Sequence, residues 1–312
     1  MSGHILALSG GVGGAKLAAG LAAVLPPDRL TIAVNTGDDF EHLGLTICPD
    51  IDSVVYALAG LNDTARGWGV ADESWQAMAM LRALSEADWF NLGDRDLGMH
   101  IARSWRLRAG ESLSQVTARL TAGLGIAHRV VPMSDDPVRT VIETDAGTLD
   151  FQRYFVAEQC RPVARAIRFT GAARAAASPG LAEALAHPDL AAIVVCPSNP
   201  YLSVDPLLAI PGVRDAIARA SVPRIAVSPL VGGKALKGPL SKLLGELGKP
   251  AGNAAIAAHY AGLIDHLVID AQDASDAKGL RTDGLCVTVT GTVMRGEDDR
   301  ERLAREIMSL AE

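Results

Sequence analysis

The polar and glycine-rich segments of this chain follow short apolar runs, and this order strongly limits the possible folds. Six such runs are rich in β-forming residues and have helical patterns between them; they are residues 5–8, 31–34, 192–196, 224–227, 267–270 and 286–290. Continuous apolar runs of this length are typical of strands buried on both faces, as in a parallel sheet. Because open parallel sheets bind ligands outside the carboxyl ends of their strands, the pattern predicts a binding site at one edge.

The stretch between the second and third apolar runs has a different pattern. Residues from about 51 to 127 have a mostly helical pattern, and residues 138–144 and 148–155 flank a glycine-containing turn. Two alternating runs around such a turn are typical of a β-hairpin. We therefore expect one α/β domain over residues 1–312. It would hold a Rossmann-like parallel sheet with helices on both faces, and a helical plus β-hairpin insertion at about residues 53–165.

Composition and charge exclude several classes of function. Apolar residues make up 49% of the chain, so a sizeable core can form, and the net charge is −7 without a Lys/Arg run. Nucleic-acid binding depends on neutralising phosphates, so we expect no nucleic-acid partner. No secretory signal opens the chain, no run approaches the roughly 18 apolar residues that span a bilayer, and the four cysteines are not at metal-ligand spacing. We expect a reduced, soluble, cytoplasmic protein without a membrane partner.

Four carboxylates lie within fifteen residues after the second apolar run. Asp38 and Asp39 end Asn35-Thr-Gly-Asp-Asp39, and Asp50 and Asp52 follow in Cys48-Pro-Asp-Ile-Asp52. Clusters of oxygen ligands suit Mg²⁺, which binds one or two carboxylates together with substrate phosphates. The alternative for a single residue is that Asp50 or Asp52 caps a helix that begins near Ser53. For the group as a whole, the pattern favours a functional site.

A glycine-rich segment, Ser9-Gly-Gly-Val-Gly-Gly-Ala-Lys16, joins the first apolar run to the first helical pattern. Residues without side chains, such as Gly11 and Gly13, let backbone N–H groups approach a phosphate at a helix N-terminus. Lys16 stands where the dinucleotide fingerprint has its third glycine, and no Gly-Lys-Ser/Thr of a Walker loop is present. The segment therefore predicts a phosphate loop of another kind, with a tight turn without a ligand as the alternative.

Three further polar segments are candidates for substrate contacts. In Leu92-Gly-Asp-Arg-Asp96, Arg95 has the forked geometry that matches phosphate oxygens, although a solvated Asp–Arg pair at a helix start is the alternative. Ser198 and Asn199 follow a buried strand and can bond a ribose or a base edge, unless they form a plain turn. The last segment predicts a second anion loop or a flexible solvated loop; its candidate residues are Gly232, Gly233, Lys234, Lys237 and Gly238.

Taken together, these motifs resemble the CofD family of 2-phospho-L-lactate transferases and their relatives. They occur in family order over nearly the whole chain, and jointly they are specific. The matching residues are Ser9 to Lys16, Asn35 to Asp39, Cys48 to Asp52, Gly67-Trp-Gly69, Leu92 to Asp96, Met133-Ser-Asp-Asp-Pro137, Phe151-Gln152, Pro197-Ser-Asn-Pro200, and Ser228-Pro with the following Gly/Lys loop.

The resemblance implies a transferase of coenzyme F-420 biosynthesis. Such an enzyme moves a phosphorylated three-carbon acid from a guanosine diphosphate-linked donor to the ribityl hydroxyl of the deazaflavin Fo, and GMP leaves. The resemblance implies Mg²⁺ as the cofactor and Fo contacts for Asp52 and Asn91. From the residues themselves, we expect Asp38 and Asp50 as metal ligands, catalysis by Asp38, Asp50 and Asp52, and further Fo contacts from Asp94 and Arg95. The expected nucleotide-binding residues are Gly11, Gly13, Lys16, Ser198, Asn199 and the residues of the second anion loop. Asn91 stands where some relatives carry Lys.

Two other classes of function remain as alternatives. One is a regulatory protein of the CofD-like group that binds a sugar nucleotide without chemistry. Those relatives tend to have a Gly/Ser-rich stretch after the Asp pair, whereas Phe40-Glu-His-Leu-Gly44 stands here and favours the enzyme. The other is a nicotinamide oxidoreductase, which the missing third glycine disfavours. The sequence leaves open which of phospholactate, phosphoenolpyruvate and phosphoglycerate is transferred, and a homodimer is expected only from the frequency of two-fold assemblies.

Overall fold

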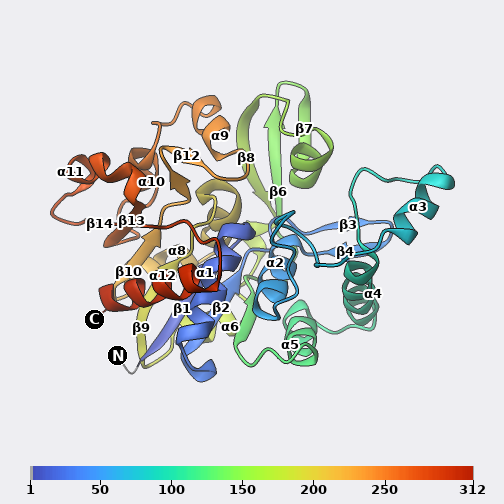
Figure 1. Ribbon diagram of the computed structural model, residues 1–312, viewed down its shortest axis with the longest axis horizontal. Coiled ribbons are helices and arrows are strands. Elements are labelled where there is room, and N and C mark those ends of the chain that lie inside the picture. Colours follow the sequence, from blue (N-terminus) through green and yellow to red (C-terminus); the bar gives the residue numbers. More distant parts are fainter. Residues whose placement is uncertain (1–2, 312) are drawn as a thin grey trace.

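A parallel sheet of seven strands forms the centre of the computed structural model, which describes residues 3–311 (Figure 1). The strand order is β14-β13-β10-β9-β1-β2-β5, and every neighbouring pair is parallel. The strands are β1 (His4–Ser9), β2 (Leu30–Val34), β5 (Arg129–Pro132), β9 (Leu190–Val195), β10 (Arg224–Val227), β13 (His266–Asp270) and β14 (Cys286–Thr290). The predicted parallel α/β fold is confirmed, and all six apolar runs are strands of this sheet.

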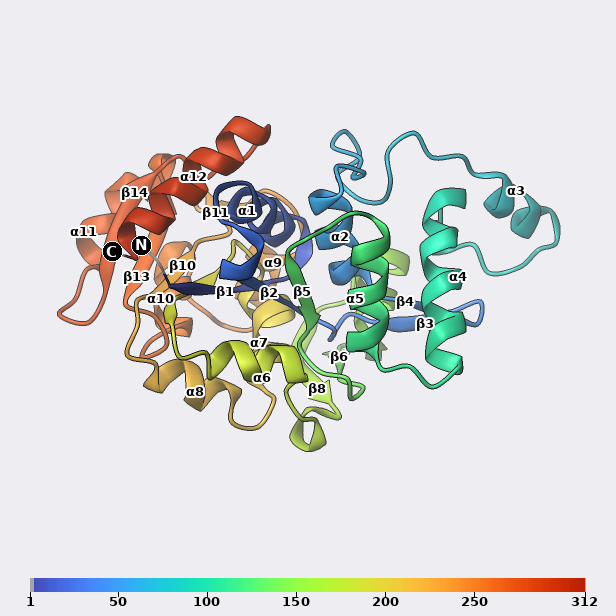
Figure 2. The same cartoon turned by 90° about the horizontal axis from the view of Figure 1, so that it is seen from below.

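Helices cover both faces of the sheet, which explains why its strands are mostly apolar. Figure 2 shows α1, α2 and α12 on one face and α6, α7 and α8 on the other. In β1, Ile5 and Ala7 pack in the core under the first group, whereas Leu6 and Leu8 pack in the core under the second. Successive side chains of a strand point to opposite faces, so burial of both faces favours apolar residues at most positions, and Thr31 in β2 is a buried exception.

The helices range from single turns to more than three turns. Their bounds are α1 (Gly11–Val24), α2 (Pro49–Leu58), α3 (Gln76–Ala83), α4 (Asp94–Arg108), α5 (Leu113–Gly123), α6 (Pro179–Leu185), α7 (Asp205–Leu208), α8 (Val213–Arg219), α9 (Leu240–Glu246), α10 (Asn253–His259), α11 (Ala277–Leu280) and α12 (Glu297–Leu310). Within residues 3–311, none of them combines the length and the apolar character that a membrane crossing requires.

Two smaller units stand beside the central sheet. Helices α3, α4 and α5 and the hairpin of β3 (Phe40–His42) and β4 (Leu45–Ile47) extend to one side in Figure 1. The antiparallel sheet β7-β6-β8 forms the other unit, with β6 (Arg139–Thr144), β7 (Gly147–Asp150) and β8 (Ala164–Thr170). The expected β6–β7 hairpin is present, and β8 adds a third strand to it.

The second strand of that hairpin is shorter than its sequence pattern indicates. After Asp150 the chain turns into a helical segment, and Phe151 and Tyr154 are buried there against Ile142 and Leu243. The alternating pattern of residues 148–155 therefore predicts a strand that is longer than β7, which ends at Asp150. The strand β5, in contrast, brings the chain back from the helical unit to the edge of the central sheet beside β2.

Candidate active site

The loops that follow β1, β2 and β9 meet at the carboxyl edge of the sheet. The Gly10 N–H donates to Ser198 Oγ over 3.1 Å, which joins the first loop to the third. A Cβ on Gly13 would lie 2.4 Å from the Pro197 carbonyl oxygen, and one on Gly14 would lie 2.6 Å from Ser198 Oγ. Gly13 and Gly14, in the first turn of α1, are therefore required by the close approach of the loop after β9, independently of any ligand.

Two carboxylates from different loops lie beside each other at this edge. Asn35 Nδ2 donates to Asp38 Oδ1 over 3.1 Å and to Asp50 Oδ2 over 2.9 Å, so one amide group bridges the two side chains. Asp50 Oδ1 accepts a further bond of 2.7 Å from the Gly11 N–H at the start of α1. Asp50 is in the first turn of α2, but its side chain does not cap that helix. We call Asp38 and Asp50 the acidic pair.

Burial makes the negative charge of the acidic pair costly. Burial and the neighbouring Asp50 carboxylate raise the pKa of Asp38 well above its usual value. Burial raises the pKa of Asp50 to about 6 despite its hydrogen bonds from Asn35 and Gly11. Among the described residues, no Lys or Arg side chain forms an ion pair with either carboxylate. Two adjacent oxygen donors without a counter-charge fit a hard divalent cation such as Mg²⁺.

The chelated protein should become less stable as pH rises, through these two carboxyls and Asp39. Burial raises the pKa of Asp39 to about 7, and the unfolded values of all three lie near 3.8. Between pH 3.8 and about pH 7, the folded state binds more protons than the unfolded state. Raising the pH through this range therefore lowers the free energy of unfolding. The melting temperature of Asp50→Asn should therefore exceed that of the wild type by roughly 2 °C or more at pH 8 in EDTA, and match it near pH 4. Parallel pH profiles for the two proteins would contradict this.

Asp52 belongs to a different buried network, which joins α2 to α4. The Arg103 guanidinium is 1% exposed and contacts both carboxylate oxygens of Asp52, with Arg103 Nη1 at 3.2 Å from Asp52 Oδ2. The same Nη1 lies 3.2 Å from His100 Nδ1, and His100 Nε2 lies 3.2 Å from Asp96 Oδ1. The Tyr56 hydroxyl donates to the same Asp96 oxygen over 2.5 Å. Each charged group is thus in contact with a partner from this network.

The network is a poor site for a metal ion, although Asp52, Asp96 and His100 offer ligand atoms within 4.8 Å of one another. An arginine nitrogen can only donate, so its contact with His100 Nδ1 places the imidazole proton on Nε2, toward Asp96. His100 Nδ1 is then occupied by Arg103 and Nε2 carries the proton, so neither nitrogen offers a free lone pair, and the guanidinium already supplies a positive charge at Asp52. A divalent cation among these atoms would lie against the Arg103 cation. The acidic pair fits a metal better.

The remaining residues expected to contact Fo lie on or near the surface around α3 and α4. Asp94 accepts bonds from the Gln76 and Ala77 N–H groups over 2.9 and 3.0 Å, so it supports the start of α3. Asn91 Oδ1 accepts from Arg82 over 2.8 Å, and Arg95 Nη1 donates to the Ala71 carbonyl over 2.7 Å. All three therefore help to hold the α3 segment against α4.

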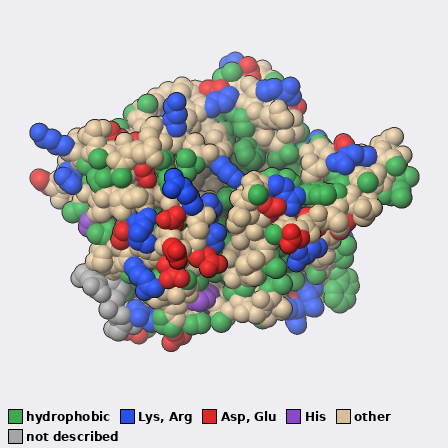
Figure 3. Space-filling view, viewed as in Figure 1, with side chains coloured by type: hydrophobic (Ala, Val, Ile, Leu, Met, Phe, Trp, Pro, Cys, Tyr) green, Lys and Arg blue, Asp and Glu red, His purple; other side chains and the backbone are tan. Residues whose placement is uncertain are grey.

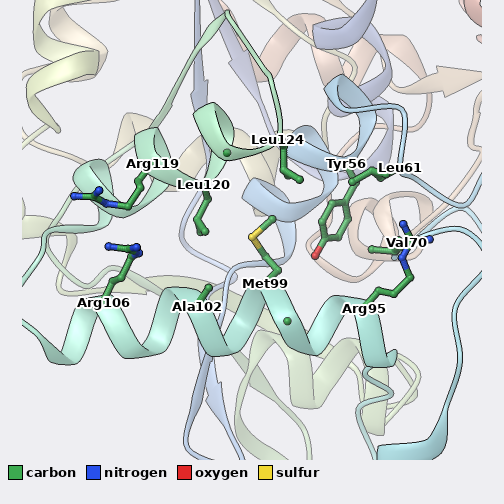
Figure 4. Close-up of a pocket in the computed structure, with 12 residues that line it drawn as sticks. Tyr56, Leu61, Val70, Arg95, Met99, Ala102, Arg106, Arg119, Leu120 and Leu124 are labelled. Carbon is green, nitrogen blue, oxygen red and sulfur yellow. The ribbon is translucent and has the colours of Figure 1, made fainter.

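Arg95 also lines a cavity of about 520 Å³ between α2, α4 and α5 (Figure 4). Met99, Leu120 and Leu124 form an apolar part of its wall, and the side chain of Tyr56 points into it. Arg106 and Arg119, at the other end, both pair with Glu111. A cavity of this size with mostly apolar walls suits a ring-sized ligand.

The residues expected to bind the nucleotide form bonds within the protein. Asn199 accepts from the Tyr201 and Leu202 N–H groups over 3.1 and 3.3 Å and so caps the turn that follows β9. Lys16 Nζ donates to the Met294 carbonyl over 2.8 Å. Ser198 is 3% exposed and accepts the Gly10 N–H described above. These contacts place Ser198 and Asn199 among the groups that shape the edge of the sheet.

The expected second anion loop lies after β10 and carries the short strands β11 (Leu230–Val231) and β12 (Lys234–Ala235). Gly232, Gly233 and Gly238 all have φ between +59° and +79°, which is the left-handed region that favours glycine. The Gly233 N–H donates to Asp273 Oδ1 over 2.6 Å. Lys234 is exposed. Lys237 Nζ donates to the Arg66 carbonyl, which is beside Gly67 in the segment between α2 and α3.

Two functional candidates escaped the sequence reasoning. Asn35 belongs to the motif Asn35 to Asp39, but the sequence offered no reason to assign it a role. In the structure it bridges the acidic pair. Arg103 had no motif at all, although its spacing from Asp96 and His100 places the three on one face of a helix. This helical spacing was the feature of the sequence that could have indicated Arg103 as a buried partner for Asp52.

The open parallel sheet, with glycine-rich turns and buried carboxylates at its carboxyl edge, places the protein among Rossmann-like α/β proteins that bind ligands at this edge. A profile of the CofD family, described as 2-phospho-L-lactate transferase CofD, matches residues 5–290. The chain belongs to this family, as its motifs indicated, and this is a family of transferases.

Similar proteins agree with this assignment over the full length of the chain. A phosphoenolpyruvate transferase of Streptomyces griseus is 40% identical, with 99% of this chain and 98% of the relative covered. A 2-phospho-L-lactate transferase of Methanosarcina mazei is 33% identical, with 97% and 99% covered. The crystal structure of a UPF0052-family protein of Bacillus halodurans has a TM-score of 0.64 at 16% identity, covers 99% of both chains and shares the fold. The named sequence relatives favour a transferase over a regulatory protein or an oxidoreductase.

Proposed function

We propose that the protein transfers a phosphorylated three-carbon acid from a guanosine diphosphate-linked donor to the ribityl hydroxyl of Fo, with release of GMP, in coenzyme F-420 biosynthesis. Membership of the CofD family supports the reaction class. The observation that carries the site is the acidic pair, which is buried at the carboxyl edge of the sheet and bridged by Asn35. Its unbalanced negative charge suits a metal that also binds the phosphates of a donor.

In this reaction the Fo hydroxyl oxygen forms a bond to the phosphorus that carries the acid, and the bond from that phosphorus to the GMP oxygen breaks. The hydroxyl proton must leave, and GMP departs as a phosphate. Transfer of this kind depends mainly on positioning and on charge stabilisation. Asp38 and Asp50 would hold Mg²⁺, which supplies positive charge to the donor phosphates. Because Asp52 is bound to Arg103, we assign the acceptance of the proton to the acidic pair rather than to Asp52.

The cavity between α2, α4 and α5 supports an acceptor site near Arg95. Helix α2 carries Asp50 in its first turn and Tyr56 in the wall of the cavity, so one helix links the acidic pair to that space. The apolar side chains of Met99, Leu120 and Leu124 suit a flat ring, and the arginines suit its polar edge. We propose that the deazaflavin ring lies there and that the ribityl chain extends toward the acidic pair.

Fo-dependent release of GMP from the three guanylylated acids, assayed side by side, tests the proposal. We expect turnover with at least one donor and none without Fo. The greater identity to phosphoenolpyruvate transferases, 40% against 33%, makes guanylylated phosphoenolpyruvate the expected best donor. Absence of GMP release with all three donors, in a folded and Mg²⁺-loaded protein, would refute the proposed reaction.

Turnover should require a divalent cation. The acidic pair has no cationic partner among residues 3–311, so the donor phosphates would meet uncompensated carboxylates without a metal. EDTA should reduce the rate to background, and excess Mg²⁺ should restore it. Full activity after exhaustive chelation, with metal content checked by elemental analysis, would contradict this expectation.

A further inference from the structure

The ion pair between Arg103 and Asp52 differs from the arginine–carboxylate pairs at the surface of the helical unit that holds α3, α4 and α5. Figure 3 shows Lys and Arg side chains beside Asp and Glu side chains on the surface of this unit. Exposed pairs of this kind, such as Arg82 with Asp88, contribute little to stability. The side chains of Arg103 and Asp52, in contrast, are only 1% and 7% exposed. Because burying two charges is costly even when they are paired, stability alone does not explain why this pair is present.

The Arg103 guanidinium is held in place by contacts with three segments of the chain. Its Nη1 donates to the Thr46 carbonyl of β4 over 3.3 Å and to Asp52 Oδ2 of α2 over 3.2 Å. The same atom lies 3.2 Å from His100 Nδ1, one turn earlier in α4, and Nη2 contacts the other oxygen of Asp52. A guanidinium is planar, so binding both oxygens also sets the plane of the carboxylate. The orientation of Asp52 is therefore determined by β4 and α4 through Arg103.

The Asp52 carboxylate keeps unused capacity to accept hydrogen bonds. A carboxylate has about four lone-pair sites. Among residues 3–311, the hydrogen bonds to this side chain come from Arg103 alone, one to each oxygen. His100 Nδ1 lies 3.6 Å from Asp52 Oδ2, which is too far for a hydrogen bond. The carboxylate is also the more exposed side chain of the pair. It can therefore accept further bonds from a ligand that carries hydroxyl groups.

Helix α2 places Asp52 between the acidic pair and the cavity. Asp50 is two residues before Asp52 in this helix. Tyr56, whose side chain points into the cavity, is one turn after Asp52 on the same side of the helix. The Tyr56 hydroxyl donates to Asp96 of α4, so α4 holds α2 at both positions. A ribityl chain that extends from the cavity toward the acidic pair would therefore pass Asp52.

We infer that Arg103 is a positioning residue for the acceptor, because it orients the Asp52 carboxylate to accept hydrogen bonds from hydroxyl groups of the ribityl chain. This inference rests on the proposed function for the identity of the acceptor. Bonds from a hydroxyl to a carboxylate are charge-assisted and depend on direction. The terminal hydroxyl must lie within reach of the donor phosphorus, and a carboxylate free to turn would hold the chain in several positions. Arg103 contacts Asp52 and acts on the acceptor only through it.

Arg103→Lys tests this role, because it keeps the positive charge but replaces the planar fork with a single ammonium group. The KM of Fo should rise about 10-fold, as expected for loss of a charge-assisted hydrogen bond, and the KM of the guanylylated donor should not change. Fluorescence titration with Fo and calorimetry with GDP should give the same division without turnover. A purely structural role would reduce the folded fraction, which lowers kcat and leaves both KM values unchanged. Arg108→Lys is the matched control, because Arg108 is in the same helix and contacts the Gly44 carbonyl.

A double-mutant cycle tests whether Arg103 acts through Asp52. Asp52→Asn should raise the Kd of Fo, and adding Arg103→Lys should raise it no further, because the carboxylate to be oriented is already lost. Effects of the two changes that multiply would overturn the inference, as would an unchanged Fo affinity in Arg103→Lys or an equal loss in Arg108→Lys. In each of these cases, turnover by the wild type would leave the proposed reaction standing. If Fo binding depends on Arg103 but no donor gives GMP release, the positioning role stands and the proposed reaction falls.

Discussion

Asp50→Asn should reduce turnover about 100- to 1,000-fold, which is the usual cost of losing one electrostatic group of an active site. The substitution keeps an oxygen that can accept the Gly11 N–H, and it removes a negative charge that burial disfavours. The fold should therefore be retained, and in EDTA the melting temperature should not fall. Steady-state rates at saturating Mg²⁺, together with thermal melts, measure both effects.

The matched control is Asp215→Asn, because Asp215 is in α8 and its side chain is 70% exposed. Its rate and its melting temperature should both stay at the wild-type values. If Asp50 only anchored the start of α1, the asparagine would serve equally and the rate would stay high. A near-wild-type rate in Asp50→Asn would therefore remove Asp50 from the proposed metal site.

Arg103→Met should lower the free energy of unfolding by about 3–5 kcal/mol, because removing one partner leaves a buried charge uncompensated. Arg103 is 1% exposed and holds both oxygens of Asp52, which is itself 5% exposed. Denaturant unfolding, with the slope compared between variants, measures the loss. Arg168→Met is the control: Arg168 pairs with Glu143 but is 68% exposed, so its loss should leave the free energy of unfolding close to the wild-type value.

A second substitution distinguishes loss of charge pairing from loss of packing. In the double variant Arg103→Met with Asp52→Leu, no buried charge is left without its partner, so most of the lost stability should return. If the double variant were as unstable as Arg103→Met alone, the ion pair would not be the cause. Activity of the double variant then tests the role of Asp52 apart from folding.

The sequence predicted the central sheet well because burial on both faces leaves a strong local signal. Runs such as Ile5 to Leu8 consist only of apolar residues, so their positions could be read directly. The edge strand β5 has only two buried valines between Arg129 and Pro132, and in β8 only Ala164 is buried while the other positions are half-buried or exposed. Both gave too weak a pattern to be distinguished from loops. The pairing of strands, which decides where these segments lie, is not a local property.

The candidate site was predicted in part, for a similar reason. The carboxylates Asp38 and Asp50 were found because they cluster in the sequence. Their arrangement depends on Asn35, and Asp52 depends on Arg103, which is 51 residues away. The sequence could not tell that Asp52 would be bound to Arg103 while the acidic pair would have no Lys or Arg partner within residues 3–311. That distinction arises from the packing of α4 on α2, and only the tertiary structure contains it.

The position of β1 between β2 and β9 has a consequence during synthesis. β1 pairs with β9 through residues such as Leu8 and Val195, so its second neighbour is made more than 180 residues later. At about 5–20 residues per second, the ribosome needs about 10–40 s to provide it. The first strand and the glycine-rich turn must remain unpaired on one side during that time. The loop after β9 that supports Gly10 also arrives only then. The nascent chain therefore emerges with a ligand-binding edge that stays incomplete until β9 and the loop after it have been made.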